Sequence, residues 1–412
     1  MRESAHIVIV GAGAAGLMAA IAAARTAPAD VRVLDGARTL GAKILIAGGG
    51  RCNVTHDEVD ETAFAGSTHP AIRKVLRRFG VRETVAFFDE IGVALKREET
   101  GKLFPVTDDA RTVLNALLGE ARERGVTIAH PRRVQVIERT GGQFRIGGDW
   151  GDVTAPRVII ATGGMSIPKS GSDGFGYSLA RALGHSTTAF MTPGLVPLTL
   201  PRDHFLCALS GVAVPATLEL RSGTGKRLVA FTDSTLLTHF GLSGPSVLDI
   251  SRYYLHAVHD DTRATLHANW LPGASPDRLD DGLQSLGGRA VLAWLRERLP
   301  ERLARSLCEH AHVDAAMRGD QLKRESRRAL VDAVTTLPLP VTGSRGYNFA
   351  EVTAGGVPLA ELHLDTMESR VCPGLYLCGE ICDVDGRIGG FNFQWAWSSG
   401  YVAGVSAARL PA

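Results

Sequence analysis

Apolar residues along the first 35 positions fall into segments with different periods. HIVIV (6–10) and VRVLD (31–35) are short apolar runs, and between them GAGAAG (11–16) leads into the alanine-rich segment LMAAIAAARTA (17–27). Short apolar runs bounded by glycine are typical of buried strands, whereas the long alanine-rich segment favours a helix. The order strand, turn, helix, strand predicts a βαβ unit with two parallel strands.

Helical spacing returns twice in the next hundred residues. Residues 69–92 carry apolar side chains three or four positions apart, with a glycine between two such stretches, and predict two short helices. Residues 108–124 predict a longer helix. Thr107 is the expected N-cap of this helix, because Asp108 and Asp109 would then lie in its first turn.

A set of short strand-like runs follows. We predict strands at 126–129, 133–138, 143–146 and 156–161, with the middle pair joined by two consecutive glycines. This pattern predicts a small antiparallel meander that leads into a strand ending at Ala161.

The character of the chain changes after residue 190. Residues 191–267 consist of short alternating segments between Gly and Pro turns, which predicts a β-rich domain. Residues 277–334 return to helical periodicity and predict a helical insert, and we interpret the basic run at 324–328 as a solvated helix face. From about residue 352, glycine-rich turns and the strand-like run CPGLYLCG (372–379) precede a final helix.

Composition narrows the class of protein. The 412 residues include 45 Lys+Arg and 43 Asp+Glu, a formal net charge of +2, so we expect no nucleic acid partner. The 47 glycines indicate many tight turns and close backbone approaches. The six cysteines show no metal-ligand spacing and favour reduced, cytoplasmic thiols and no metal site. Residues 5–24 carry no charge, but their glycine-rich break argues against a signal or membrane segment.

The first chemical motif is the GxGxxG stretch at 11–16, placed after a buried strand and at the start of a helix. Gly11 permits the sharp turn, Gly13 lets a pyrophosphate approach the helix N-terminus, and Gly16 lets helix and strand pack closely. Asp35 follows the second strand, nineteen residues past Gly16. A carboxylate there accepts hydrogen bonds from ribose hydroxyls and repels a 2′-phosphate, so FAD or NAD is expected at this turn and NADP is not expected at this turn.

Three further stretches favour a flavin. GGGRCN (48–53) suits backbone packed against a flat ring, and the ATGG turn (161–164) resembles one that returns the chain to the cofactor in flavoproteins of the glutathione-reductase superfamily. LYLCGE (375–380), followed by GGFNF (389–393), resembles the second flavin motif of that superfamily, in which the acid, here Glu380, binds the ribityl chain. A helix starting near Asn392 and Phe393 would offer free N–H donors to a reduced flavin, which is negatively charged near N1.

Together these stretches resemble the BaiN-type NAD(P)/FAD-dependent oxidoreductases of bacteria along nearly the whole chain. The resemblance also rests on the segments GAKILIAGGGRCNVT (41–55), TGKLFPVT (100–107), THFGLSGPSVLDIS (238–251) and TMESRVCPGLYLCGEICDVDGRIGGFNFQWAWSSG (366–400). Asp35 stands where Glu is usual, and Ala42 where a basic residue is frequent. We expect Ala42 to alter the contacts near Lys43.

The resemblance implies an α/β fold with a Rossmann-like, three-layer ββα FAD-binding domain built from both chain ends. We expect this domain at 1–190 and 352–412, a β-rich substrate domain at 191–270 and 335–351, and a helical insert at 271–334. The residues expected to contact noncovalent FAD are Gly11, Gly13, Ala14, Ala15, Gly16, Asp35, Gly36, Lys43, Gly49, Gly50, Arg51, Cys52, Asn53, Val134, Ala161, Thr162, Gly163, Gly379, Glu380, Gly390, Asn392 and Phe393.

The expected reaction is transfer of hydride from NAD(P)H to FAD and then to an activated C=C bond of a small organic substrate. No second GxGxxG follows a strand, so NAD(P)H would dock transiently. The loop holds one cysteine, Cys52, which argues against a dithiol relay, and Cys378 and Cys382 are expected to be structural. Candidate acids or anion-binding groups, chosen because they lie in or beside the motif loops, are Arg51, Tyr177, His239, Tyr347 and Arg387.

Two other functions stay open from the sequence. An FAD-dependent oxidase or dehydrogenase would use the same site in the oxidative direction. A flavin-binding protein associated with RNA modification is the other alternative, and the small net charge argues against it. We predict no oligomeric state.

Overall fold

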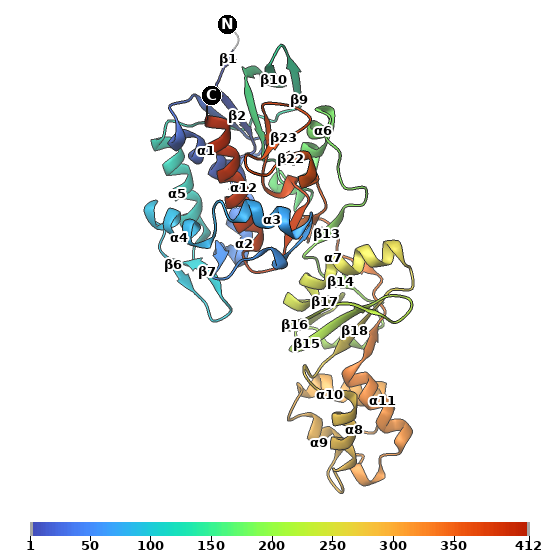
Figure 1. The fold of residues 1–412 in the computed structure, drawn as a ribbon. Helices are drawn as coiled ribbons and strands as arrows, with labels where there is room; N and C mark the ends of the chain where they lie inside the picture. The colour runs from blue at the N-terminus through green and yellow to red at the C-terminus, as the bar shows by residue number, and fades with distance from the viewer. Residues whose placement is uncertain (1–2, 410–412) are drawn as a thin grey trace. The chain divides into compact units, whose positions relative to one another are not determined.

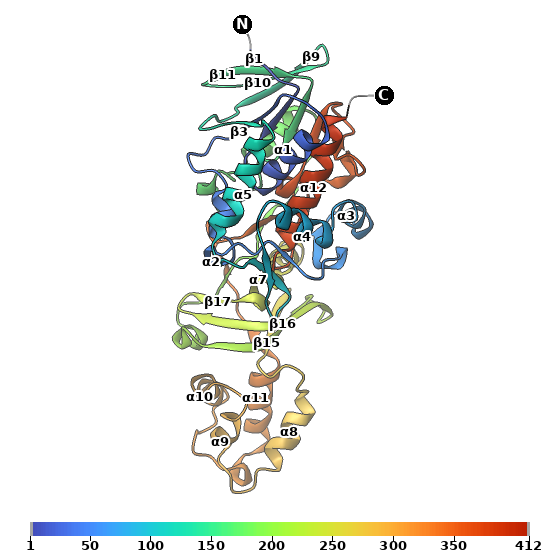
Figure 2. The same cartoon turned by 90° about the vertical axis from the view of Figure 1, so that its left-hand side faces the viewer.

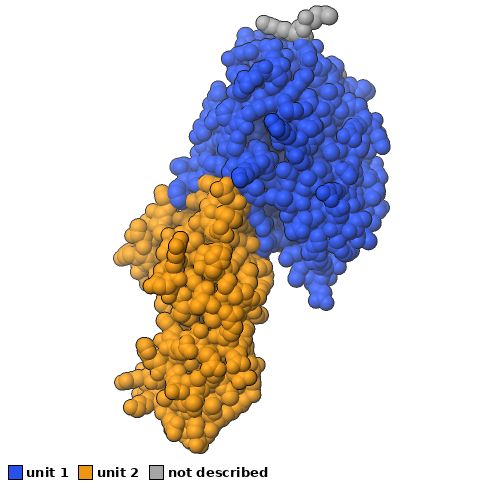
Figure 3. Space-filling view, turned by 180° about the vertical axis from the view of Figure 1, so that it is seen from behind, with its two compact units in different colours: residues 1–191, 351–412 blue, residues 192–350 orange. Residues whose placement is uncertain are grey.

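The structure, a computed structural model, describes residues 3–409 (Figure 1). Contacts divide the chain into two compact units, residues 1–191 with 351–412 and residues 192–350 (Figure 3). The first unit is therefore assembled from both ends of the chain.

A seven-stranded sheet forms the centre of the first unit. Its order is β22-β23-β24-β12-β2-β3-β8, and the five strands from β24 to β8 run parallel. The strands are β22 (Leu362–His363), β23 (Glu368–Ser369), β24 (Leu375–Leu377), β12 (Arg157–Ile160), β2 (Ile7–Val10), β3 (Val31–Leu34) and β8 (Thr127–Ala129). Strand β2 is buried along its whole length, as expected for a parallel strand covered on both faces. The predicted βαβ unit is confirmed.

Helices and a second sheet complete three layers. Helices α1 (Ala14–Thr26) and α12 (Phe391–Ala408) contact the parallel sheet, with α5 (Ala110–Glu123) beside α1. Strand β10 of a second, mixed sheet contacts β12, so the parallel sheet lies between this second sheet and the helices (Figure 2). That second sheet has the order β1-β11-β10-β9, comprising β1 (Glu3–Ser4), β11 (Gly151–Ala155), β10 (Gln143–Gly148) and β9 (Val136–Thr140). The predicted Rossmann-like α/β fold is confirmed.

Two small residues let α1 and α12 approach closely. A Cβ atom added at Gly400 would lie 2.5 Å from the carbonyl oxygen of Ala15, and one at Gly404 would lie 2.2 Å from that of Ala19. Larger residues at either position would push α12 away from α1. Because α1 carries the N-terminal glycine turn and α12 the C-terminal motif, this packing joins the two chain ends.

The start of α5 corrects one prediction. The N-cap is Asp109, whose carboxylate accepts a hydrogen bond from the Arg111 N–H at 2.9 Å. Thr107 is therefore not the N-cap, and its hydroxyl bonds instead to that of Thr112 at 2.7 Å. The left-handed backbone of Asp108 (φ 52°) explains the shift, because the chain turns there before the helix begins.

Other local predictions are partly confirmed. Helices α3 (His69–Leu76) and α4 (Val81–Glu90) are the predicted pair, separated near Gly80. The meander is present with its Gly-Gly turn, but its first strand begins at residue 136 rather than 133, and β11 was not predicted. Shorter strands complete the unit: β4 (Thr55–His56) with β7 (Lys102–Pro105) and β6 (Leu95–Arg97), and β5 (Phe64–Gly66) with β25 (Val384–Gly386).

The second unit contains an antiparallel sheet of order β19-β18-β15-β16-β17-β14-β20. Its strands are β19 (Leu337–Leu339), β18 (Thr265–Asn269), β15 (Ala213–Arg221), β16 (Arg227–Thr238), β17 (Gly241–Ser243), β14 (Leu198–Thr199) and β20 (Gly343–Ser344). The β-rich prediction for 191–267 missed one long helix, α7 (Pro245–Asp260), which packs on the sheet.

Four helices lie between β18 and β19 in the sequence. They are α8 (Pro276–Gln284), α9 (Val291–Leu295), α10 (Glu301–His310) and α11 (Arg324–Thr335), as the helical periodicity predicts. One apolar core contains residues from both the sheet and these helices, including Trp270 and Leu295. The division of this unit into separate β-rich and helical domains stays a prediction.

Candidate functional site

The turn between β2 and α1 has the geometry that a dinucleotide-binding turn requires. Gly11 has a φ of +106°, and a Cβ atom on Gly16 would lie 1.9 Å from the Gly11 carbonyl oxygen. Gly13 differs, because a Cβ atom there would meet nothing within 4 Å. Gly11 and Gly16 are thus required by the protein itself, whereas Gly13 leaves open space at the N-terminus of α1, where N–H groups attract a phosphate.

Asp35 follows β3 and closes this turn. Its carboxylate accepts hydrogen bonds from the backbone N–H of Ala12 at 2.6 Å and of Ala37 at 2.7 Å. Each carboxylate oxygen has two lone pairs, so both oxygens retain acceptor capacity for a ribose hydroxyl. Gly36, beside it, packs on Arg133, and Val134 of the same segment is buried.

The GGG stretch ends helix α2 (Ala42–Gly50), which is distorted at its C-terminal end. Gly48, Gly49 and Gly50 all have positive φ values, from 57° to 87°, a region of backbone conformation that favours glycine. A Cβ atom on Gly49 would meet nothing within 4 Å. Asn53 follows, and its buried side-chain oxygen has no hydrogen-bond partner in the described part of the chain.

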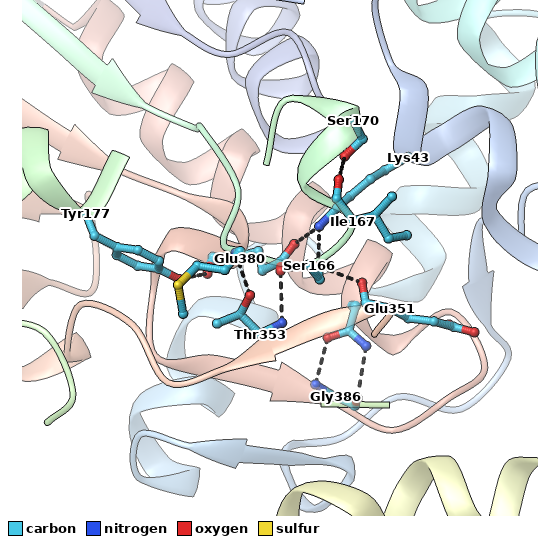
Figure 4. A network of polar contacts seen from close by, with 11 residues as sticks. Lys43, Ser166, Ile167, Ser170, Tyr177, Glu351, Thr353, Glu380 and Gly386 are labelled. Atoms are coloured by element: carbon cyan, nitrogen blue, oxygen red, sulfur yellow. Dashed lines mark hydrogen bonds and ion pairs between the residues drawn. The ribbon is translucent and has the colours of Figure 1, made fainter. Parts of the chain in front are cut away.

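A polar network around Glu380 brings together four distant segments (Figure 4). The Lys43 ammonium lies 2.6 Å from one carboxylate oxygen of Glu380. The other oxygen accepts from the Ser166 hydroxyl at 2.8 Å and the Thr353 N–H at 2.9 Å. Lys43 also donates to Ser166 at 2.6 Å, and the Ser166 hydroxyl lies 3.1 Å from the Glu351 carbonyl oxygen. The carboxylate therefore has a fixed position and a cationic partner.

The ATGG turn lies directly against this carboxylate. A Cβ atom on Gly164 would lie 2.7 Å from a Glu380 oxygen, and one on Gly163 would lie 2.7 Å from the Ser172 hydroxyl. The buried hydroxyls of Thr162 and Ser172 have no hydrogen-bond partner among the described residues. Ala161, just before, hydrogen-bonds to β2 through Val10 at 2.9 Å.

The N-terminus of α12 is anchored by its own side chains. The Asn392 amide accepts from the Gly386 N–H at 2.8 Å and donates to the Gly386 carbonyl at 2.9 Å. Trp395 donates to the Gly379 carbonyl at 3.0 Å, and Phe393 stacks on Trp397 at a centroid distance of 5.6 Å. Gly390, the N-cap, has a left-handed backbone. These contacts fix the helix end whose first N–H groups have no intrahelical partner.

The open space at Gly13 and Gly49 and the unpartnered polar atoms of Asn53, Thr162 and Ser172 fit a dinucleotide cofactor. Its phosphate would lie at the helix N-terminus, and its hydroxyls would face carboxylates and hydroxyls of this unit. The residues predicted to contact FAD come from both chain ends and lie in this one unit. Their individual contacts with the cofactor stay predictions.

Three predicted anion-binding or acidic residues lie in the same unit. Arg51 forms an ion pair with Glu98 at 2.6 Å and stacks over Phe104 at 4.0 Å, so a substrate carbonyl would compete with a carboxylate for its guanidinium. Tyr177 is buried and its hydroxyl lies 3.4 Å from the Glu380 carbonyl oxygen. Arg387 is exposed. Their catalytic roles stay predictions.

The other two candidates lie in the second unit. His239 is exposed in the turn between β16 and β17, edge-on to Phe240 at 5.1 Å. Tyr347 follows β20, and burial raises the pKa of its phenol to about 12, so it remains protonated at neutral pH. Their roles also stay predictions.

The cysteines behave as buried thiols. All six are free and buried. Desolvation raises the pKa of Cys52 and of Cys378 to about 12 and raises that of Cys382 well above its ordinary value. At neutral pH these groups are thiols rather than nucleophilic thiolates.

This burial predicts a loss of stability in alkali. Unfolded thiols ionise near pH 9, whereas Cys378 in the folded chain stays protonated up to about pH 12. Between these values the unfolded chain releases a proton that the folded chain keeps, so the free energy of unfolding falls as pH rises. Denaturant unfolding at pH 8 and pH 10 should show a smaller decrease for Cys378→Ala than for the wild type. An equal decrease in both would contradict the assignment.

Ser166, Ser172 and Thr353 are site residues that sequence reasoning missed. Ser166 and Ser172 lie within the GMSIPKSGSDG stretch (164–174) that follows the ATGG turn, so their position beside a motif was the available signal. Thr353 comes from β21 (Val352–Ala354) and had no comparable signal.

Residues 3–409 contain no candidate metal site and no candidate membrane-spanning helix. No group of three or more His, Cys, Asp or Glu side chains there could hold a metal ion. No described helix combines the length and apolar character needed to cross a membrane.

The fold and the glycine turn define a Rossmann-type dinucleotide-binding protein. A family model described as HI0933-like protein Rossmann domain matches residues 5–406, and the chain belongs to this family, the one that includes the BaiN-type enzymes. The predicted family is thereby confirmed, and the protein is an FAD-dependent oxidoreductase.

Curated relatives align over nearly their full length. The chain is 35% identical over 98% of its length to a 3-dehydro-bile acid delta(4,6)-reductase of Clostridium scindens, all of which is covered. It is 34% identical to a ribosomal RNA dihydrouridine synthase of Escherichia coli, with 97% of each chain covered. A ribosomal RNA dihydrouridine synthase of Haemophilus influenzae is 31% identical over 99% of this chain and 100% of its own.

Solved structures share the fold at lower identity. A 3-ketosteroid delta1-dehydrogenase of Sterolibacterium denitrificans superposes with a TM-score of 0.54 at 13% identity, covering 98% of this chain and 99% of its own. A 3-ketosteroid-delta4-(5alpha)-dehydrogenase of Rhodococcus jostii gives 0.50 at 16% identity, covering 99% and 97%. These likenesses concern the fold.

Proposed function

We propose that the protein reduces an activated ring C=C bond, using hydride that NAD(P)H delivers to FAD. The observation that carries this proposal is that three curated relatives, aligned over 97–99% of this chain, bear the names of a delta(4,6)-reductase and of dihydrouridine synthases. Both names describe the addition of hydrogen across a ring C=C bond. The oxidative direction has no such support.

Bound FAD supplies a ring system that accepts a hydride and passes it to the substrate. The chain's own residues bind and orient this group. The N–H groups at the start of α1 would hold the pyrophosphate, and the open space at Gly13 would admit it. Glu380, held by Lys43, Ser166 and the Thr353 N–H, would accept hydrogen bonds from the ribityl chain.

The N-terminus of α12 supports the reductive role. Its free N–H groups and positive dipole end would stabilise negative charge on a bound flavin. The Asn392 amide keeps this end rigid through its two hydrogen bonds to Gly386. Because these donors are already fixed in the protein, they would need no rearrangement to stabilise negative charge on a bound flavin.

Two substrate classes fit the proposed reaction. A small organic ring compound with a conjugated C=C bond follows from the bile acid reductase relative. The second candidate, uridine in ribosomal RNA, is favoured by the two dihydrouridine synthase relatives, and it opposes the expectation that nucleic acid is not a partner. The proposed reaction is the same in both.

An anaerobic titration tests the donor and the direction. The purified, FAD-loaded protein is mixed with NADH or NADPH, and the flavin absorbance is followed. We expect bleaching within seconds by one of the two donors and return of the colour on addition of an enone or of uridine-containing RNA. A flavin that neither donor bleaches, or that reoxidises only in air with formation of peroxide, would contradict the reductase proposal.

A further inference from the structure

An arginine side chain lies between two phenyl rings in the second unit. The guanidinium carbon of Arg345 is 3.5 Å from the ring centroid of Phe349 and 4.4 Å from that of Phe240. Phe240 comes from the turn between β16 and β17, and the other two residues follow β20. Two separate loops therefore hold one guanidinium in place through cation–π contacts.

The donors of this guanidinium are not used by the described part of the chain. Residues 3–409 provide neither a carboxylate within ion-pair distance of Arg345 nor an acceptor for its side-chain N–H groups. Arg298, which stacks on Trp294 at 4.0 Å, shows the contrast, because it donates to the Trp294 carbonyl at 2.8 Å and pairs with Glu297. Arg345 is thus a positioned cation with five available donors.

The stack also presents an exposed aromatic surface. Phe349 is 49% exposed, and the other strongly exposed large hydrophobic side chains of residues 3–409 are all aliphatic. His239 is exposed beside Phe240. A half-exposed ring next to an unpaired guanidinium suits a ligand that has both a planar ring and an anionic group.

We infer that Arg345 and Phe349 form a docking site for a nucleotide, with its base stacked on Phe349 and its phosphate bound by Arg345. The assignment of this nucleotide to NAD(P)H rests on the proposed function, which requires a donor site outside the single GxGxxG turn. A net charge of only +2 favours a dinucleotide over a long RNA strand, whose many phosphates need a basic surface.

The test uses a probe that cannot react. ADP-ribose and its 2′-phosphate carry the base and phosphates of NADH and NADPH without the nicotinamide, and their binding to the FAD-loaded protein is measured by calorimetry. We expect Arg345→Met and Phe349→Ala each to weaken binding of the preferred probe at least about tenfold, as for loss of one charge-assisted hydrogen bond or one stacked base. Phe349→Tyr should retain binding, and the KM for NAD(P)H should rise more than kcat falls.

Arg298→Met is the matched control, since it removes an arginine stacked on an aromatic ring in the same unit, and it should bind the probe as the wild type does. Thermal unfolding of every variant separates lost binding from lost folding. Wild-type affinity in both Arg345→Met and Phe349→Ala, or no probe binding by the wild type, would overturn the inference. So would variants that lose affinity for an oligouridylate but keep it for ADP-ribose. Flavin bleaching by NAD(P)H in the wild type tests the proposed function separately.

Discussion

Replacing Gly13 with alanine should abolish FAD retention while leaving the protein folded. Gly13 is the N-cap of α1 with a φ of −80°, which alanine adopts without strain, and the added Cβ atom would meet no protein atom within 4 Å. The methyl group would instead occupy the space through which a pyrophosphate approaches the helix N-terminus. We expect the Kd for FAD to rise at least about 100-fold, equivalent to about 2.7 kcal/mol.

Titration of the apoprotein with FAD, followed by flavin fluorescence, measures this change. Gly119→Ala in α5 is the matched control, because its Cβ atom also meets nothing within 4 Å and lies in a helix away from the turn. It should bind FAD normally. A Gly13→Ala protein that binds FAD within about threefold of the wild type would show that this turn does not hold the pyrophosphate.

Gly16→Ala should fail in a different way. Its Cβ atom would lie 1.9 Å from the Gly11 carbonyl oxygen, so the turn itself must deform. Loss of folded protein, rather than loss of FAD from folded protein, is the expected result. The two variants together separate the space for the cofactor from the packing of the turn.

Replacing Lys43 with methionine should lower both stability and FAD affinity. The Lys43 and Glu380 side chains are 25% and 18% exposed, so the pair lies between a surface and a buried ion pair. Removing the ammonium leaves the carboxylate without its cation, and we expect a loss of about 1–3 kcal/mol in the free energy of unfolding. FAD affinity should fall too, because Glu380 is no longer fixed where the ribityl chain would lie.

A double-mutant cycle with Glu380→Gln tests this coupling in the apoprotein and in FAD titrations. We expect the double variant to lose less free energy of unfolding and less FAD affinity than the sum of the two single variants. The second substitution removes the unpaired charge that the first one leaves. Lys74→Met is the control, because Lys74 pairs with Asp365 at the same distance, 2.6 Å, with both side chains about half exposed. Lys74→Met should lower the free energy of unfolding by less than about 1 kcal/mol. Additive losses would contradict the coupling.

Short-range features of the first unit could be predicted because their signals lie within a few residues. The spacing of Gly11, Gly13 and Gly16 between an apolar run and an alanine-rich segment predicts a strand, a turn and a helix, and the structure contains them. Where the local signal was ambiguous, the prediction was wrong. Thr107 and Asp109 are both good N-cap residues, and the backbone turn at Asp108 selected the second.

Helix α7 shows the same limit on a larger scale. The segment from Pro245 to Asp260 follows alternating strands and was included in a β-rich domain, yet it folds as a helix whose buried side packs on the antiparallel sheet. The apolar positions of this helix are explained by the sheet that covers them. Packing against the sheet therefore decides the structure of Pro245–Asp260, and the alternating pattern predicted for 191–267 does not extend through it.

The family, the cofactor class and the glycine turn were determined by the sequence alone, because each depends on residues that are close in the chain. The tertiary structure alone placed the Lys43 ammonium against Glu380, 337 residues away, since β24 pairs with β12 and β12 pairs with β2 in one sheet. It also brought Phe240 close to Arg345 and Phe349, because β17 and β20 pair with opposite edges of β14. Contacts between residues so far apart arise from strand order and packing, which no local spacing encodes.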